Sequence, residues 1–299
     1  MHFLGLFKLC QRLLLFLPLT TASAAETAAA HKNAFHYDNS NNWYLDYPEC
    51  GGDKQSPIII KTNKTLEVSI PPITFGSYDV FFSNYAVLKN NGHSIKFNVP
   101  DTIEFIRPFI TDGPLNGMYE AIEVHFHWGS PLCKGSEHQI NQRRYDLEMH
   151  IVHLNTKYGS VEEAREYDDG IAVIGAFFKV EKTALPTFHP GLDTVFNTVP
   201  FVLLYNSSAT TNQLFTLGSM LANINRDNFY TYQGSLTTPP CSQAVTWIVY
   251  PEVIPIPLFQ LQNFWFVRDD RGRKLLNNFR PVQPLGAREV YHRSADEYY

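Results

Sequence analysis

The sequence has little positive charge, no internal repeat and no linker rich in Pro, Gly or Ser. Its 299 residues are 18% charged, and the formal net charge of −5 argues against nucleic acid or an anionic membrane as a partner. Because no linker divides the chain, we expect one folded domain. Hydrophobic residues make up 44% of the sequence, which is enough to bury a substantial core.

The apolar run near the N-terminus is too short to cross a membrane, because Pro18 interrupts it before the roughly 18 residues that a spanning helix needs. Lys8 precedes this run and Arg12 lies within it. Residues 22–24 (Ala-Ser-Ala) then match a small-x-small cleavage pattern. We therefore expect a signal peptide over residues 1–24, no membrane anchor, and a protein that is secreted to the extracellular space.

Cysteine is scarce, and three cysteines remain after removal of the signal peptide: Cys50, Cys133 and Cys241. An exported chain meets an oxidising environment, so we expect one disulfide and one leftover thiol, with three pairings possible. Asn63 and Asn206 begin Asn-x-Ser/Thr sequons and are candidate N-glycosylation sites.

Short runs of alternating apolar and polar residues, separated by turn-forming residues, predict a sheet-dominated mixed α/β fold with a few short helices. The order of the strands cannot be derived from this pattern. We expect strands at 122–128, 146–154, 171–180 and 244–250, and helices at 161–167, 213–223 and 258–267.

Two of the expected strands carry histidines in a spacing that suits metal binding. Period-two alternation places His125 and His127 on one face of the first strand, opposite large apolar residues. In the second strand, His150 and His153 face opposite sides, so only one of them can point into the same cavity. Ligating histidines need an acceptor for their other ring N–H, and carboxylates lie two residues before His125 and His150.

Three neutral imidazoles leave a fourth tetrahedral position for water, which is the arrangement of a catalytic zinc site. At this point the residues fit a zinc hydrolase or hydratase. They also fit a metal-dependent barrel dioxygenase with a His-x-His strand.

A wider set of blocks resembles the alpha-class carbonic anhydrases. Residues 123–130 (EVHFHWGS), 135–138 (GSEH), 148–155 (EMHIVHLN) and 234–240 (GSLTTPP) are similar to the signature blocks of that family, in the family's order. Together with NNGH at 90–93 and NFRP at 278–281, the resemblance spans about residues 37–285. It implies one catalytic domain over 25–299, with a core of about 35–286 and a large, mostly antiparallel, twisted central β-sheet.

The resemblance implies that Zn²⁺ is held by His125, His127 and His150, and that Glu148 orients His150. Zinc-bound hydroxide would then hydrate carbon dioxide reversibly to bicarbonate and a proton; zinc lowers the pKa of its bound water to about 7 in carbonic anhydrase itself. Glu123 stands where many relatives have Gln. Its negative charge should raise the basicity of the ligand and of the bound water.

Other positions take their expected roles from the same resemblance. Thr237 would accept a hydrogen bond from the zinc-bound hydroxide while donating its own proton to Glu137, and Thr238 would help to hold bicarbonate. The apolar wall for carbon dioxide would consist of Val152, Val173, Leu236, Val245 and Trp247, and the residues that order water would be Tyr37 and Asn91.

His93 matches the family's proton shuttle, and Lys96 stands where a neutral polar residue is common. If Lys96 points inward, its charge should lower the pKa of His93; if it extends to solvent, it should have little effect. The resemblance also pairs Cys50 with Cys241 and leaves Cys133 free. We expect a monomer that acts on small molecules, with a covalent dimer through Cys133 as the alternative.

A binding or matrix protein related to this family, with little catalysis, is the other function that we consider. Such a protein would lose metal ligands, whereas all three histidines are present here. Outside the metal centre, we expect His138 and His153 to have structural roles.

Overall fold

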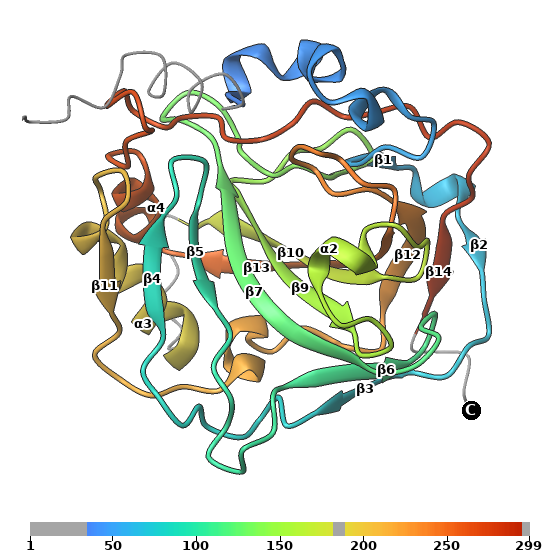
Figure 1. Cartoon of the computed structure of the whole chain (residues 1–299), viewed down its shortest axis with the longest axis horizontal. Helices are drawn as coiled ribbons and strands as arrows, with labels where there is room; N and C mark the ends of the chain where they lie inside the picture. The colour runs from blue at the N-terminus through green and yellow to red at the C-terminus, as the bar shows by residue number, and fades with distance from the viewer. Residues whose placement is uncertain (1–34, 182–188, 295–299) are drawn as a thin grey trace, which may run out of the picture. The chain divides into compact units, whose positions relative to one another are not determined.

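The computed structural model describes residues 35–181 and 189–294, so the expected signal peptide at 1–24 lies outside the described residues. A twelve-stranded twisted sheet organises the described chain (Figure 1). Its main path runs in the order β11 (Ser208–Thr210), β4 (Val87–Asn90), β5 (Ile95–Asn98), β7 (Tyr119–Trp128), β9 (Leu147–Asn155), β10 (Ile171–Val180), β13 (Val245–Ile256), β12 (Phe229–Gly234), β14 (Tyr291–Arg293) and β2 (Leu66–Glu67).

Most neighbouring strands in this sheet are antiparallel; the parallel pairs are β10 with β13 and β14 with β2. Strand β6 (Phe109–Asp112) pairs with both β7 and β3 (Ile73–Gly76), which lies beside it. A separate parallel pair is formed by β1 (Ile59–Ile60) and β8 (Gln139–Ile140). The predicted fold class, a sheet-dominated domain with a mostly antiparallel central sheet, is therefore confirmed.

The helices of the described residues are short. The α-helices are α2 (Val161–Ala164), α3 (Pro190–Thr198) and α4 (Leu258–Phe264), and the 3-10 helices are η1 (Tyr37–Leu45), η2 (Pro48–Gly51), η3 (Thr62–Lys64), η4 (Val199–Phe201) and η5 (Leu217–Leu221). Within the parts of the chain that the structure describes, none of the helices has the length and apolar character needed to cross a membrane.

The prediction of a helix at 213–223 was wrong, because this segment contains only the five-residue η5. The Thr216 side chain accepts a hydrogen bond from the Ser219 amide and starts the turn there. Ala222, with φ of 50°, ends it, since a left-handed residue cannot continue a right-handed helix. Helix α3 was not expected; its sequence begins with Pro at the first turn and buries Leu192 and Val195.

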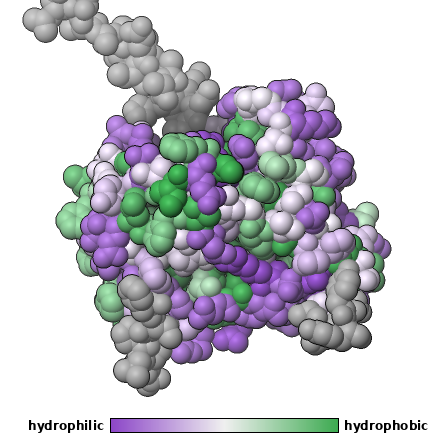
Figure 2. Space-filling model, turned by 90° about the horizontal axis from the view of Figure 1, so that it is seen from below, coloured by the Kyte–Doolittle hydropathy of each residue, from purple (hydrophilic) through white to green (hydrophobic). Residues whose placement is uncertain are grey.

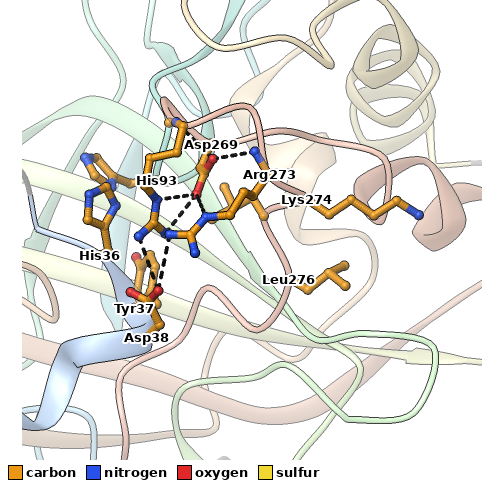
Figure 3. A pocket seen from close by; sticks show the side chains of 11 residues that line it. His36, Tyr37, Asp38, His93, Asp269, Arg273, Lys274 and Leu276 are labelled. Atoms are coloured by element: carbon orange, nitrogen blue, oxygen red, sulfur yellow. Dashed lines mark hydrogen bonds and ion pairs between the residues drawn. The ribbon is translucent and has the colours of Figure 1, made fainter.

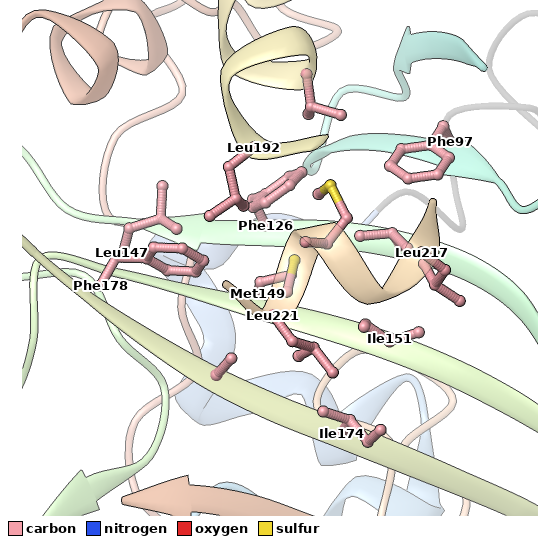
Figure 4. Close-up of a cluster of buried hydrophobic side chains, with 14 of the residues drawn as sticks. Phe97, Phe126, Leu147, Met149, Ile151, Ile174, Phe178, Leu192, Leu217 and Leu221 are labelled. Carbon is pink, nitrogen blue, oxygen red and sulfur yellow. The ribbon is translucent and has the colours of Figure 1, made fainter. Parts of the chain in front are cut away.

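The strands expected at 122–128, 146–154, 171–180 and 244–250 are present as β7, β9, β10 and β13. Side chains alternate across these strands, so each face of the sheet packs against its own hydrophobic cluster. On the face shown in Figure 4, Phe126, Met149 and Ile174 from the strands pack against Leu192 of α3 and Leu221 of η5. The residues between them on β7 and β9 include the candidate metal ligands, which therefore point to the other face.

Candidate metal centre

Strand pairing brings the three candidate ligands together. His125 on β7 lies directly opposite His150 on the antiparallel neighbour β9, and His127 follows two residues later on the same face of β7. The ring centroids of His127 and His150 are 4.6 Å apart, and His125 lies 5.1 and 5.2 Å from them. One nitrogen from each ring lies within 4.8 Å of the other two, so the three residues could hold a metal ion.

The outward nitrogen of each ring faces a hydrogen-bond acceptor. The three contacts are His125 Nδ1 with Glu123 Oε1 at 3.0 Å, His127 Nδ1 with the Asn278 carbonyl oxygen at 2.8 Å, and His150 Nε2 with Glu148 Oε1 at 2.8 Å. Because a neutral imidazole has one proton, donation outward leaves the lone pair on the inward nitrogen. All three inward nitrogens are therefore prepared to bind a cation.

These inward nitrogens crowd one another. His150 Nδ1 lies 3.3 Å from His125 Nε2. His127 Nε2 is buried, makes no hydrogen bond with the described residues and lies 3.4 Å from Glu137 Oε2. Converging lone pairs repel unless a cation lies between them, so this donor set fits a zinc ion with one position left open.

Burial keeps the imidazoles of His127 and His150 neutral. It lowers the pKa of His127 well below the usual range and that of His150 to about 4, although Glu148 partly opposes the shift at His150. A metal ligand must be the neutral base, and both residues are in that form at neutral pH.

Glu148 is itself held firmly by a residue that we expected to be structural. His138 donates its backbone N–H to Glu148 Oε2, and its Nδ1 lies 2.8 Å from Oε1. Burial raises the pKa of Glu148, but the interactions with His138 and His150 outweigh it and hold the pKa well below its usual range. His138 thus fixes the carboxylate that orients His150. The sequence signal for this contact is weak, because the two residues are ten positions apart.

Lys96 forms an ion pair with Glu123 on the metal side of the sheet. Burial raises the pKa of Glu123, but contacts with His125 and Lys96 outweigh it and lower the pKa to about 2. Lys96 therefore points inward, but toward Glu123. The pKa of His93 is lowered mainly by burial, with a smaller contribution from His36, and Lys96 is not among the causes.

Glu137 Oε2 lies 3.4 Å from His127 Nε2 and 4.0 Å from His150 Nδ1, and the Thr237 side chain hydrogen-bonds to Glu137. Burial raises the pKa of Glu137 to about 8, while hydrogen bonds from the Arg280 backbone N–H and the Thr237 side chain oppose this shift. A dication at the nearby nitrogens would also favour the charged carboxylate. Thr237 is 5% exposed, so its hydroxyl is shielded from bulk water.

The disulfide predicted between Cys50 and Cys241 is confirmed. It anchors the loop that carries Thr237, in which the Cys241 amide donates to the Thr238 carbonyl oxygen. The Arg280 guanidinium donates to the Cys50 carbonyl oxygen at 2.8 Å, while its backbone amide donates to Glu137. One buried arginine thus connects the disulfide to the polar side of the site.

The expected apolar wall is built across three neighbouring strands. Val152 on β9, Val173 on β10 and Trp247 on β13 lie side by side in register. They belong to one buried cluster with Val245, and the half-buried Leu236 packs against that cluster. These side chains lie next to the histidines because Val152 follows His150 by two residues on the same face of β9.

Gly175 was not predicted as part of this site. It lies opposite His150 on β10, and a Cβ atom at this position would be 3.3 Å from Glu148 Oε1. A side chain there would press on the carboxylate that orients His150. Asn278 was also missed as a partner of His127, because its contact is made by a backbone carbonyl, which any residue carries.

His93 lies on the predicted turn between β4 and β5. Asn91 Oδ1 accepts hydrogen bonds from the His93 and Ser94 amides, and Gly92 has a φ of 86°. Asn91 therefore shapes the turn in addition to any contact with water. Phe35 stacks on the His93 ring with centroids 3.9 Å apart.

A cavity of about 170 Å³ lies beside this ring, as Figure 3 shows. Tyr37 also lines it, and burial raises the pKa of this tyrosine well above its usual range. Asp38 and Asp269 form ion pairs with Arg271 and Arg273 at the same cavity.

Three further predicted positions are exposed: Asn63, Asn206 and the unpaired Cys133. None of them takes part in the metal centre.

The family model of the eukaryotic-type carbonic anhydrases matches residues 38–294. The chain is 35% identical over 259 residues to carbonic anhydrase 7 of Homo sapiens, which covers 85% of this chain and 93% of the relative. It is 33% identical over 288 residues to carbonic anhydrase 6 of Canis lupus familiaris, and the match covers 93% of this chain and 84% of the relative. Carbonic anhydrase 15 of Mus musculus is 34% identical over 256 residues, and the match covers 83% of this chain and 78% of the relative.

Proposed function

Because the chain belongs to the eukaryotic-type carbonic anhydrase family, we propose that it binds one zinc ion and catalyses the reversible hydration of carbon dioxide to bicarbonate and a proton. The ligands are His125, His127 and His150. One observation carries this proposal: three buried or half-buried imidazoles turn one nitrogen each to a common point, while their other nitrogens face acceptors.

When bound, zinc supplies a hydroxide nucleophile at neutral pH. Thr237 would accept a hydrogen bond from this nucleophile and fix its direction, because its own proton is committed to Glu137. The contact between Thr237 and Glu137 supports this arrangement. His138 and Glu148 hold the ring of His150, so the site needs little reorganisation during the reaction.

The apolar side of the site holds carbon dioxide. Val152, Val173, Leu236, Val245 and Trp247 offer no strong ligand, and none is needed, because the apolar substrate requires only a position within reach of the nucleophile. Thr238 holds the charged product at the opposite, polar side. Its place in the loop braced by the disulfide supports this role.

His93 accepts the proton that must leave the site, and Tyr37 and Asn91 help to order the water that connects them. The lowered pKa of His93, which results mainly from burial, keeps its ring neutral and able to accept a proton at neutral pH.

The protein acts outside the cell, after cleavage of residues 1–24. A disulfide supports export, since such bonds persist in oxidising compartments. Asn63 and Asn206 are exposed and accessible to glycosylation. Expression of the full chain in a secreting eukaryotic cell should give a medium-borne protein whose first residue lies near position 25. Retention of the whole chain inside the cell would contradict this assignment.

Metal analysis and a carbon dioxide hydration assay test the catalytic proposal together. The wild-type protein should contain one zinc per chain, hydrate carbon dioxide and be inhibited by a sulfonamide that binds zinc. His127→Ala should lose zinc and activity together, since two imidazoles hold the ion less tightly than three. His292→Ala is the matched control, because His292 contacts Glu67 and Asn228 and belongs to β14. Full activity in a zinc-free His127→Ala protein would refute the proposal.

A further inference from the structure

Lys96, Glu123 and His125 form a continuous chain of contacts. Lys96 on β5 lies opposite His125 on β7, and Glu123 precedes His125 by two residues on the same face. The Lys96 ammonium donates to Glu123 Oε2, while Glu123 Oε1 lies 3.0 Å from His125 Nδ1. The two oxygens of one carboxylate therefore bind two different partners, a cation and an imidazole.

This ion pair lies in a partly buried position. The Lys96 and Glu123 side chains are 27% and 25% exposed, respectively. Charges at such a depth are screened less by salt and water than charges on the surface. Each of them can therefore influence a cation held by the neighbouring histidine.

The two charges act on a bound dication in opposite directions. A carboxylate that accepts the ring N–H of a ligating histidine makes the imidazole a stronger donor, whereas an ammonium group nearby repels the cation. The structure places the two opposite charges in direct contact. Because Lys96 and Glu123 are in contact, their opposite charges nearly cancel, and the net charge that acts on His125 is small.

We infer that Lys96, acting through its contact with Glu123, offsets the negative charge that His125 experiences, so that zinc affinity depends on the balance of the pair. This inference rests on the zinc site proposed above. It predicts that the two residues have opposite effects on zinc binding when each is changed alone, and nearly cancelling effects when both are changed.

Zinc affinity, measured by competition with a chelator, tests the inference directly. Glu123→Gln keeps an oxygen that can accept from His125 Nδ1 but leaves the Lys96 charge unopposed, so zinc should bind about 10- to 100-fold more weakly. Lys96→Asn leaves the Glu123 charge unopposed, and zinc should bind about 10-fold more tightly. The double variant should return to within about threefold of the wild type.

Two variants separate this contact from a general effect of charge. Lys89 lies opposite Lys96 on β4, one strand further from Glu123, and both lysines line a surface pocket. Lys89→Asn therefore removes the same charge from the same region and should leave zinc affinity unchanged. Lys96→Arg keeps the charge and should preserve the affinity. The visible spectrum of the cobalt-substituted protein should change in Lys96→Asn and Glu123→Gln but not in Lys89→Asn.

The outcomes distinguish this inference from the proposed function. If wild-type protein binds no zinc, the proposed function fails. If it binds zinc and hydrates carbon dioxide, but both single variants weaken zinc alike, Lys96 and Glu123 serve only to support the fold. Unchanged affinity in Lys96→Asn would equally overturn the inference, because the pair would then contribute nothing to the metal centre.

Discussion

Which nitrogen of each histidine carries the proton decides whether the three rings can bind a cation. Glu123, Glu148 and the Asn278 carbonyl all accept from the outward nitrogens. The acceptors differ in charge, since two are carboxylates and one is a neutral carbonyl. The donor strength of the ligands is therefore set by residues that do not touch the metal themselves.

Replacement of His93 tests the route by which protons leave. His93→Ala should lower kcat at low buffer concentration and leave kcat/KM largely intact, because attack on carbon dioxide precedes proton exit. Added imidazole should restore turnover. Since burial lowers the pKa of His93, its ring should also stay neutral to a lower pH than an exposed histidine, which an NMR titration can measure.

His292→Ala provides the comparison for this experiment, because His292 lies on β14 and stacks on Tyr230. It should show normal turnover at every buffer concentration. If His93→Ala reduced kcat and kcat/KM equally and imidazole gave no recovery, His93 would have a role other than proton transfer.

At the residue scale, the sequence was most informative where side chains alternate along one strand. Period-two alternation alone put His125 and His127 on one face and left His150 or His153 for the same cavity. The resemblance then selected His150. Contacts that join distant segments were not predictable in this way: the pairing of Lys96 with Glu123 depends on the register between two strands, which the sequence does not state.

At the scale of elements, the site depends on the order of strands in the sheet. Strands β7, β9, β10 and β13 are neighbours, so histidines from the first two meet the apolar wall from the last three. The pattern of the sequence predicted these strands but not their order, because alternation describes the two faces of a strand and not its neighbours. Parallel pairing of β10 with β13 in particular joins segments some seventy residues apart.

The disulfide joins a second pair of distant elements, η2 and the loop after β12. Replacing both Cys50 and Cys241 by Ser should lower the free energy of unfolding by about 4 kcal/mol, since the bond closes a long segment of chain. Activity should fall as well, because the loop carries Thr237 and Thr238. Urea unfolding and hydration assays can measure the two effects on the same samples.

Cys133→Ser is the control for this variant, because it also removes a sulfur but breaks no disulfide. It should unfold at the same urea concentration as the wild type. A double variant of Cys50 and Cys241 with unchanged stability and activity would show that the bond does not brace the loop.

At the scale of the whole molecule, the net charge argues against a nucleic-acid partner. The face in Figure 2 mixes hydrophilic and hydrophobic residues, and the net charge of the chain is −5. Such a charge repels polyanions but does not hinder an uncharged substrate from reaching a buried site. The composition thus argues against polyanionic partners, whereas the site itself was needed to specify the chemistry.

The unpaired Cys133 could join two chains covalently. The thiol is exposed, and its neighbour Leu132 is 94% exposed, so a second chain could reach it without a change of fold. Lys134 is paired with Asp146 and is therefore engaged with a carboxylate rather than with the thiol. We therefore expect a monomer. Non-reducing electrophoresis of freshly purified protein should show one band at the monomer position, both for the wild type and for Cys133→Ser. A dimer that disappears in Cys133→Ser would reverse this expectation and show that the exposed thiol joins two chains.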